Sequence, residues 1–157
     1  MPTSPPRRDK AKAQGDRFIV VTGGCGAIGG AVCGELAKRP RTTVVLTARE
    51  LTRAQRAAKQ ISELTGGKVV GMELDVCSQP SVRRFAAAYA ERFKRGLDVL
   101  INNAAVVPAE RRETTGGVEL TFATNVLGYF LVMRALLPSL RTAAERRGGA
   151  RVVNVAR

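Results

Sequence analysis

Four glycines crowd into seven positions directly after an apolar stretch of the chain. They are Gly23, Gly24, Gly26 and Gly29, and the last three satisfy the pattern G-x-G-x-x-G. Glycine lets a backbone turn sharply and approach a pyrophosphate closely, and the N–H groups of a following helix attract the anion. The pattern therefore predicts a phosphate site for a dinucleotide, with a tight turn that holds no ligand as the alternative.

A second group that could do chemistry is Arg49, which lies twenty residues after Gly29 at the end of the next apolar stretch. In a dinucleotide fold an acid at this place bonds the ribose 2′-OH of NAD, whereas an arginine attracts a 2′-phosphate. Arg53 lies one helical turn later and could join it. One charge-assisted contact contributes about 1.5–3 kcal/mol, so the pair favours NADPH over NADH; a solvated loop arginine is the alternative.

A strand, a turn and a helix must position these residues. The pattern of apolar residues predicts this strand–turn–helix unit several times along the chain. Short apolar runs alternate along the chain with segments of helical periodicity, and Gly66-Gly67, Pro80 and Gly148-Gly149 mark boundaries. This alternation predicts an α/β fold with a doubly wound, Rossmann-like parallel sheet of about five strands. The expected strands are 18–22, 43–48, 68–74, 97–101 and 151–155, and the expected helices are 27–38, 51–65, a helix capped by Ser78, and 117–141.

Composition limits the class of protein. The chain has 157 residues, of which 45% are hydrophobic, and no apolar run approaches the ~20 residues of a membrane span. Three cysteines without ligand spacing predict reduced thiols in a cytoplasmic protein. Because the chain contains no histidine, histidine catalysis and histidine metal sites are excluded.

The formal net charge of +13 raises the alternative of a nucleic-acid partner. The basic residues are scattered over nearly every expected helix, and the chain has no Trp and only two Tyr, so a base-stacking platform is poorly supplied. We therefore expect neither a nucleic acid nor a membrane as partner. Residues 1–16 are expected to form a disordered basic tail; their Arg and Ser content leaves a mitochondrial presequence open, although Asp9 and the prolines spoil an amphipathic helix.

From Arg17 to Val155 the chain resembles the N-terminal, cofactor-binding part of the short-chain dehydrogenases/reductases, and within them the NADPH-dependent carbonyl reductases. The motifs that carry the resemblance are Thr22-Gly23-Gly24-Cys25-Gly26-Ala27-Ile28-Gly29, Val44 to Arg49, Leu74-Asp75-Val76, Leu97 to Ala105, Thr124-Asn125 and Arg151 to Val155. The resemblance implies hydride transfer from NADPH to a small ketone or aldehyde, and a homo-oligomer as one form of the protein. A non-catalytic NADP(H)-binding or regulatory module is the alternative.

The resemblance also implies roles for single residues. The cofactor would lie on the glycine turn, including Gly23 and Ile28, and Asp75 and Val76 would hold its adenine ring. Asn102 and Ala104, within the element 102–105, would lie near the nicotinamide ribose and tie the fourth strand to its neighbours. Asn125 would be the asparagine of the catalytic Asn-Ser-Tyr-Lys set and hold a water of the proton relay.

The sequence departs from the family at several positions. Ala27 replaces the middle glycine of the turn, Gly26 supplies no basic residue before it, and Ala105 replaces the glycine that ends Asn-Asn-Ala-Gly. The catalytic Ser and the Tyr-x-x-x-Lys pair would lie beyond Arg157, since Phe93 and Met133 stand four positions after the two tyrosines. Residues 17–157 are therefore interpreted as an incomplete domain, truncated after the fifth strand and inactive alone.

An incomplete domain should leave apolar surface uncovered. We expect Val152, Val153 and Val155 to lie at a bare sheet edge, and the helix that carries Phe122 to Leu137 to lack neighbours. Uncovered strand edges favour aggregation. The chain is therefore expected to show poor solubility or marginal stability.

Overall fold

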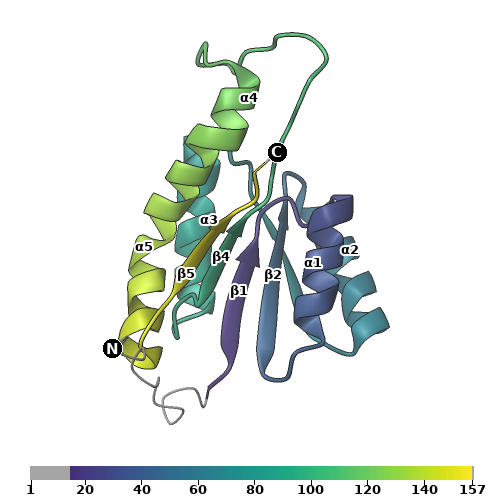
Figure 1. Cartoon of the computed structure of the whole chain (residues 1–157), viewed down its shortest axis with the longest axis vertical. Helices are drawn as coiled ribbons and strands as arrows, with labels where there is room; N and C mark the ends of the chain where they lie inside the picture. The colour runs from purple at the N-terminus through teal and green to yellow at the C-terminus, as the bar shows by residue number, and fades with distance from the viewer. Residues whose placement is uncertain (1–14, 157) are drawn as a thin grey trace, which may run out of the picture.

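Five parallel strands form a single sheet in the computed structural model, which describes residues 15–156 (Figure 1). The strand order is β3-β2-β1-β4-β5, so the chain reverses its direction of travel across the sheet between β1 and β4. This confirms the doubly wound, Rossmann-like architecture. The expected disordered tail falls mostly on residues 1–14, which lie outside the described residues. The strands are β1 Arg17–Val21, β2 Thr42–Ala48, β3 Lys68–Glu73, β4 Val99–Asn102 and β5 Arg151–Asn154.

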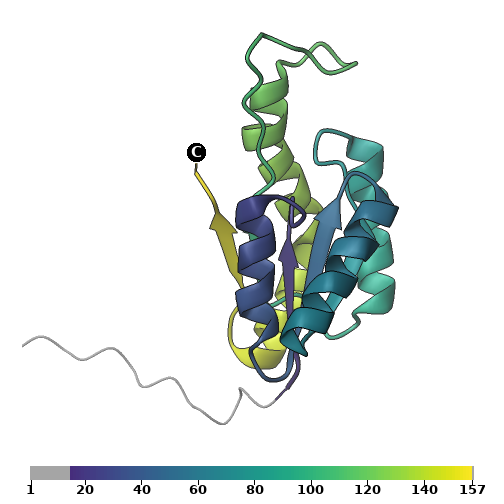
Figure 2. The same ribbon diagram turned by 90° about the vertical axis from the view of Figure 1, so that its right-hand side faces the viewer.

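Helices cover both faces of the sheet (Figure 2). One face carries α1 (Ala27–Ala37) and α2 (Leu51–Thr65), and the other carries α3 (Gln79–Arg92) and α5 (Gly128–Arg147). The segment expected as one helix over 117–141 begins later and ends later. It consists of α4 (Leu120–Phe122), the π-helix η2 (Ala123–Leu127) and α5, which follow one another without a break.

The two central strands explain why the sheet is the core. All but the last residue of β2 and all but the first of β1 are buried, as expected for strands covered on both faces. Val20, Val45 and Leu100 belong to the core on the α3 and α5 side, while Val21 and Val44 belong to the core on the α1 and α2 side. Successive side chains of each strand point to opposite faces of the sheet, so the hydrophobic interior consists of two layers.

Sequence signals for helix ends are confirmed. The Ser78 hydroxyl accepts a hydrogen bond from Ser81 N at 3.3 Å and caps α3, with Pro80 in the first turn. Gly66 and Gly148 end α2 and α5 with φ of 68° and 80°, a left-handed conformation that glycine adopts at low cost. On α3 the side chains of Val82, Phe85 and Tyr89 are buried, and the Tyr89 hydroxyl donates to Gly96 O at 3.2 Å.

A buried ion pair fastens the end of α5 to the edge of the sheet where the strands begin. Arg147 Nη1 lies 2.7 Å from Asp98 Oδ1, and the two side chains are only 11% and 9% exposed. The same carboxylate accepts a hydrogen bond from Phe18 N at 2.8 Å, and Arg147 also donates to Asp16 O. One charge pair therefore joins the last helix to the starts of β1 and β4.

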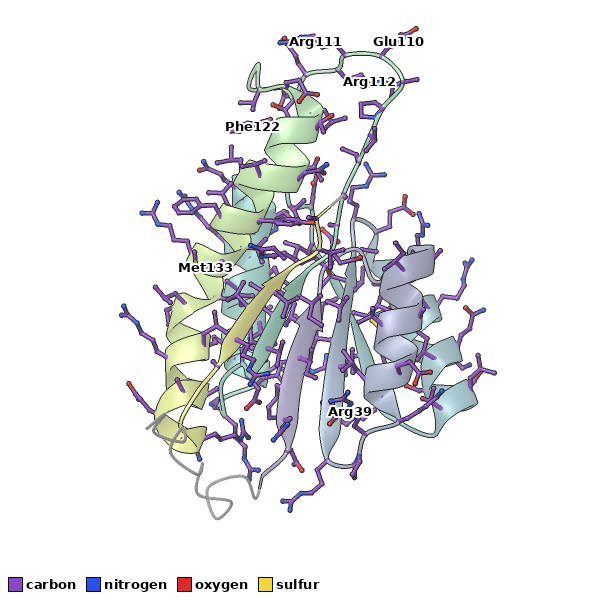
Figure 3. All side chains as sticks on the ribbon, viewed as in Figure 1. Arg39, Glu110, Arg111, Arg112, Phe122 and Met133 are labelled. Carbon is purple, nitrogen blue, oxygen red and sulfur yellow. The ribbon has the colours of Figure 1, made fainter. Side chains whose placement is uncertain are left out.

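The expected bare apolar surface is present in part, since Val155 is half-buried and its O accepts a hydrogen bond from the Tyr129 hydroxyl at 3.2 Å. Phe122, Val126 and Phe130 are each at least half exposed, and Val152 and Val153 of the edge strand β5 are 42% and 43% exposed. Figure 3 labels Phe122 near the start of this helical segment. The effect on solubility stays a prediction.

The segment Leu120–Arg147 is also long and apolar enough to cross a membrane, with a mean hydropathy of 1.5 over its most apolar window. It packs against the sheet through Val132, Leu136 and Leu140. Core helices of soluble proteins pass the same test of length and composition, so this finding alone is weak evidence for a membrane segment.

The buried ion pair leads to a test of stability. Asp98→Ala leaves the Arg147 guanidinium buried without its carboxylate, so we expect a loss of about 3–5 kcal/mol in the free energy of unfolding. Urea denaturation followed by circular dichroism measures it. Glu35→Ala breaks the exposed pair with Lys38, 2.6 Å long, and should cost less than about 1 kcal/mol. Equal losses for both variants would contradict the role assigned to Asp98.

Candidate functional site

A cavity of about 470 Å³ opens at the carboxyl end of the sheet, where the chain reverses its direction between β1 and β4. Crevices at this place are where open α/β sheets bind their ligands. The turn after β1, the ends of β2 and β3 and the segment after β4 all contribute to its wall. Of the predicted residues, the wall contains Gly23, Gly26, Ile28, Arg49, Arg53, Asp75, Val76 and Ala104.

Gly23 allows the turn after β1 to pass close to the segment after β4. Its φ is 64°, and a Cβ there would lie 2.8 Å from Ala104 Cα. Gly29 is equally restricted, because a Cβ would collide with Gly23 O and lie 2.7 Å from Asn103 Nδ2. Both glycines therefore serve close packing between backbones.

The two remaining glycines of the pattern differ from each other. A Cβ on Gly24 would lie 2.5 Å from Leu46 Cγ, and this buried glycine does not contribute to the cavity wall. Gly26 is exposed, lines the cavity, and a Cβ there would meet only Gly23 O at 3.5 Å. It is the residue before α1, and beside it Ile28 is 51% exposed. The exposed Gly26 thus leaves room beside the start of α1, where an anion is favoured.

Thr22 and Asn103 join the ends of β1 and β4 beneath this turn. The Thr22 hydroxyl accepts hydrogen bonds from Asn103 N at 2.9 Å and Ala104 N at 3.0 Å. In return, Asn103 Nδ2 donates to Thr22 O at 2.9 Å and to Gly23 O at 3.2 Å. Both side chains are at most 2% exposed. The single-residue predictions included neither of them, although both stand in the motifs quoted for the resemblance.

Arg49 and Arg53 place two guanidinium groups on the wall between β2 and α2. Burial raises the pKa of the Cys77 thiol, and the charge of Arg49 partly opposes that rise. Burial likewise raises the pKa of Cys25, and the charge of Arg53 partly opposes it. Both arginines thus border the cavity that Cys25 and Cys77 also line, which suits an anionic ligand.

Asp75 and Val76 follow β3 and lie beside the end of β2, because Leu74 N donates to Ala48 O at 2.8 Å. Asp75 Oδ1 accepts a hydrogen bond from Cys77 N at 3.0 Å, and its own N–H donates to Ser81 Oγ at 2.9 Å. Val76 is buried, and a Cβ on Gly128 would lie 3.1 Å from it. The carboxylate is thus held in a local turn at the cavity, which suits the predicted contact with an adenine amine.

Asn102 is not brought to the cavity, unlike its neighbours Asn103, Ala104 and Ala105. Its side chain turns toward β5, and Nδ2 donates to Asn154 Oδ1 at 2.9 Å. Its buried Oδ1 has no hydrogen-bond partner among residues 15–156. This hydrogen bond holds the Asn102 side chain at β5, whereas Asn103 lines the cavity.

Asn125 lies within the π-helix and fixes the segment after β4. Its Oδ1 accepts from Val106 N at 2.9 Å, and its Nδ2 donates to Val106 O at 3.0 Å. Asn125 itself does not line the cavity, whereas the preceding Thr124 does. Single π turns occur often at functional sites. The predicted water in a proton relay stays a prediction.

Within the described part of the chain, no group of three or more Cys, Asp or Glu side chains is placed to hold a metal ion. The site offers an open helix start, two arginines and a carboxylate around one cavity. This arrangement can bind a phosphorylated dinucleotide.

Comparisons with known proteins point the same way. A family model described as short chain dehydrogenase matches residues 17–156. Among curated proteins, human retinol dehydrogenase 13 is 36% identical over 132 residues, and protochlorophyllide reductase from Avena sativa is 38% identical over 126 residues. These alignments cover 83% and 78% of this chain but only 39% and 40% of the relatives, so the chain matches about two fifths of their length.

Solved structures share the fold. NADPH-bound carbonyl reductase from chicken fatty liver superposes with a TM-score of 0.74 at 29% identity, over 90% of this chain and 60% of that one. An alcohol dehydrogenase from Thermococcus sibiricus, complexed with 5-hydroxy-NADP, gives a TM-score of 0.72 at 28% identity, over 87% and 57% of the two chains.

Gly29 and Gly26 should tolerate an added methyl group differently, because a Cβ would be crowded at Gly29 and have room at Gly26. Gly29→Ala should lower the free energy of unfolding by about 1–3 kcal/mol, because its Cβ meets backbone that cannot yield. Gly26→Ala should stay within about 0.5 kcal/mol of the parent. Urea denaturation of both variants measures the difference. A Gly29→Ala variant as stable as the parent would show that the turn is looser than described.

Proposed function

Because this chain belongs to the short-chain dehydrogenase family, we propose that its cavity binds NADPH and that it forms the cofactor half of a reductase for ketones or aldehydes. The observation that carries the proposal is the cavity at the β1–β4 crevice, with Arg49 and Arg53 on one side and the glycine turn on another. Similar solved structures in complex with 5-hydroxy-NADP, NADPH or NADP add support.

The residues present fit this cofactor. The pyrophosphate would lie over Gly26 at the start of α1, where Gly26 lacks a side chain that could fill the space. Arg49 and Arg53 would hold the ribose 2′-phosphate, since a guanidinium offers it a bidentate contact. Asp75 would accept a hydrogen bond from the adenine amine.

Bound NADPH supplies the hydride, and the protein supplies position and a proton. Asn103 and Thr22 hold the strand ends beside the cavity, and Asn125 holds the segment after β4 through Val106. No Tyr-x-x-x-Lys pair occurs in the 157 residues. A general acid must come within hydrogen-bond reach of the carbonyl oxygen, and we assign none to the residues in hand.

The alternative is a module that binds NADP(H) without catalysis. The missing Tyr-x-x-x-Lys pair favours it for these 157 residues taken alone. We place the chain in the cytoplasm in either case.

The choice between NADPH and NADH tests the proposal directly. Titration calorimetry of the 157-residue chain should show NADPH binding that is about ten- to a hundredfold tighter than NADH binding. Arg49→Ala should remove most of that preference, since it deletes one charge-assisted contact, and leave NADH affinity unchanged. Arg56→Ala, an exposed arginine of α2 outside the cavity wall, is the matched control. Absence of heat with both nucleotides would refute the proposed function.

Turnover tests whether these 157 residues supply a general acid. With NADPH and a simple aldehyde probe, we expect no loss of the nicotinamide absorbance above background, because a general acid is lacking. A measurable rate would show that another residue protonates the carbonyl oxygen.

A further inference from the structure

The end of the sheet opposite the cavity is basic. All connections from a helix to the next strand lie there, and they contain Lys38, Arg39 and Arg41 before β2 and Lys94 and Arg95 before β4. Three strands also begin with a basic residue. We call this set the basic rim: Arg17, Lys38, Arg39, Arg41, Lys68, Lys94, Arg95 and Arg151.

The connections at the cavity end contain more acidic than basic residues. Arg49, Arg111 and Arg112 stand there against Glu50, Asp75, Glu110, Glu113 and Glu119. Figure 3 shows Arg39 near one end of the molecule and the loop with Arg111 and Arg112 at the other. The charge of the rim is therefore placed away from the cofactor site and is not explained by it.

Few acids neutralise the rim. Glu35 pairs with Lys38 at 2.6 Å, while Asp16 is shared by Arg41 at 3.7 Å and Arg95 at 3.8 Å. The five other rim residues are exposed, and none forms an ion pair within residues 15–156. Basic residues often serve a helix dipole, but the last turns of α1 and α2 contain none. The rim is thus excess charge on a surface.

A second cavity of about 330 Å³ opens within the rim, between the α1–β2 and α2–β3 connections. Its wall contains the four cations Lys38, Arg39, Arg41 and Lys68. Among residues 15–156, Asp16 is the only acid that lines it. Arg41 has a φ of 56°, a left-handed conformation that is rare outside glycine and often marks a functional constraint. The chemistry of this wall suits a phosphate group.

The apolar residues at this end of the molecule favour a lipid over a nucleic acid as the anionic partner. Leu64, one residue before the cavity wall, is 86% exposed. Phe18 and Phe93 are at most 9% exposed, so this end offers no aromatic ring on which a nucleic-acid base could stack. An exposed leucine among cations is what an anionic lipid interface binds.

We propose that the basic rim docks this protein on an anionic lipid membrane, with a lipid phosphate in the second cavity and Leu64 among the acyl chains. This orientation turns the cofactor cavity away from the lipid surface, so NADPH can enter while the protein is bound. The proposal replaces the expectation that no membrane is a partner, and it does not depend on the proposed function.

Sedimentation of the full chain with vesicles tests the proposal. Vesicles in which about a third of the lipid is phosphatidylserine should bind the protein, and pure phosphatidylcholine vesicles should not. Arg39→Gln/Lys68→Gln should weaken binding about 25-fold, since each cation near such a surface contributes about fivefold. The matched control Arg83→Gln/Arg84→Gln removes the same charge from exposed positions of α3 and should change binding less than about twofold.

Further measurements show whether the anion that the rim binds belongs to a lipid, a nucleic acid or free phosphate. Leu64→Ser should weaken vesicle binding but leave its dependence on phosphatidylserine intact, and raising salt from about 0.1 M to about 0.5 M should release the protein. Equal binding to both vesicle types, or equal losses in both double variants, would overturn the proposal. Binding to duplex DNA or inorganic phosphate without vesicle binding would also overturn it. Thermal melts and NADPH titration of each variant separate these outcomes from unfolding and from failure of the proposed function.

Discussion

The cofactor end of this molecule depends on the close approach of two backbones that are about eighty residues apart in sequence. Thr22 closes the end of β1 with a hydroxyl that accepts two N–H groups from the segment after β4, and Gly23 lets that segment pass where a Cβ would overlap Ala104. Thr22 and Asn103 are buried, so an N–H group left without an acceptor there would cost about 1–3 kcal/mol. This junction therefore fixes the ends of β1 and β4 relative to each other beside the crevice.

The rest of the site follows from topology once that junction is fixed. Parallel strands with right-handed crossovers bring every strand end to one edge, so Arg49 and Asp75 reach the same cavity although they follow different strands. The same rule sends every helix-to-strand connection to the opposite edge. A molecule of this kind has two chemically independent ends, and here one end holds the nucleotide cavity while the other holds the basic rim.

Most of the fold could be predicted because strands buried on both faces and glycine at helix ends leave direct marks on a sequence. Gly66, Gly148 and Ser78 stand where the helices begin or end. Asn102 was placed at the cofactor by resemblance, but its side chain bonds Asn154 of β5, a partner more than fifty residues away that the motif alone does not indicate. The basic rim could not be seen in the sequence, because its residues come from separate connections that only the sheet order brings together.

The π-helix has a consequence for the long helical segment that contains it. A π turn holds one residue more than an α turn, and each residue of a helix rotates its neighbours by about 100°. The bare side chains Phe122 and Val126 precede or belong to this turn, while the bare Phe130 and the buried Val132 and Leu136 follow it. Loss of one residue from 123–127 would return the segment to regular α phase and swing everything upstream around the axis. Phe122 would then face a different direction, and Asn125 would lose its register with Val106. The apparent irregularity in the helix therefore sets how the residues before it are rotated relative to α5.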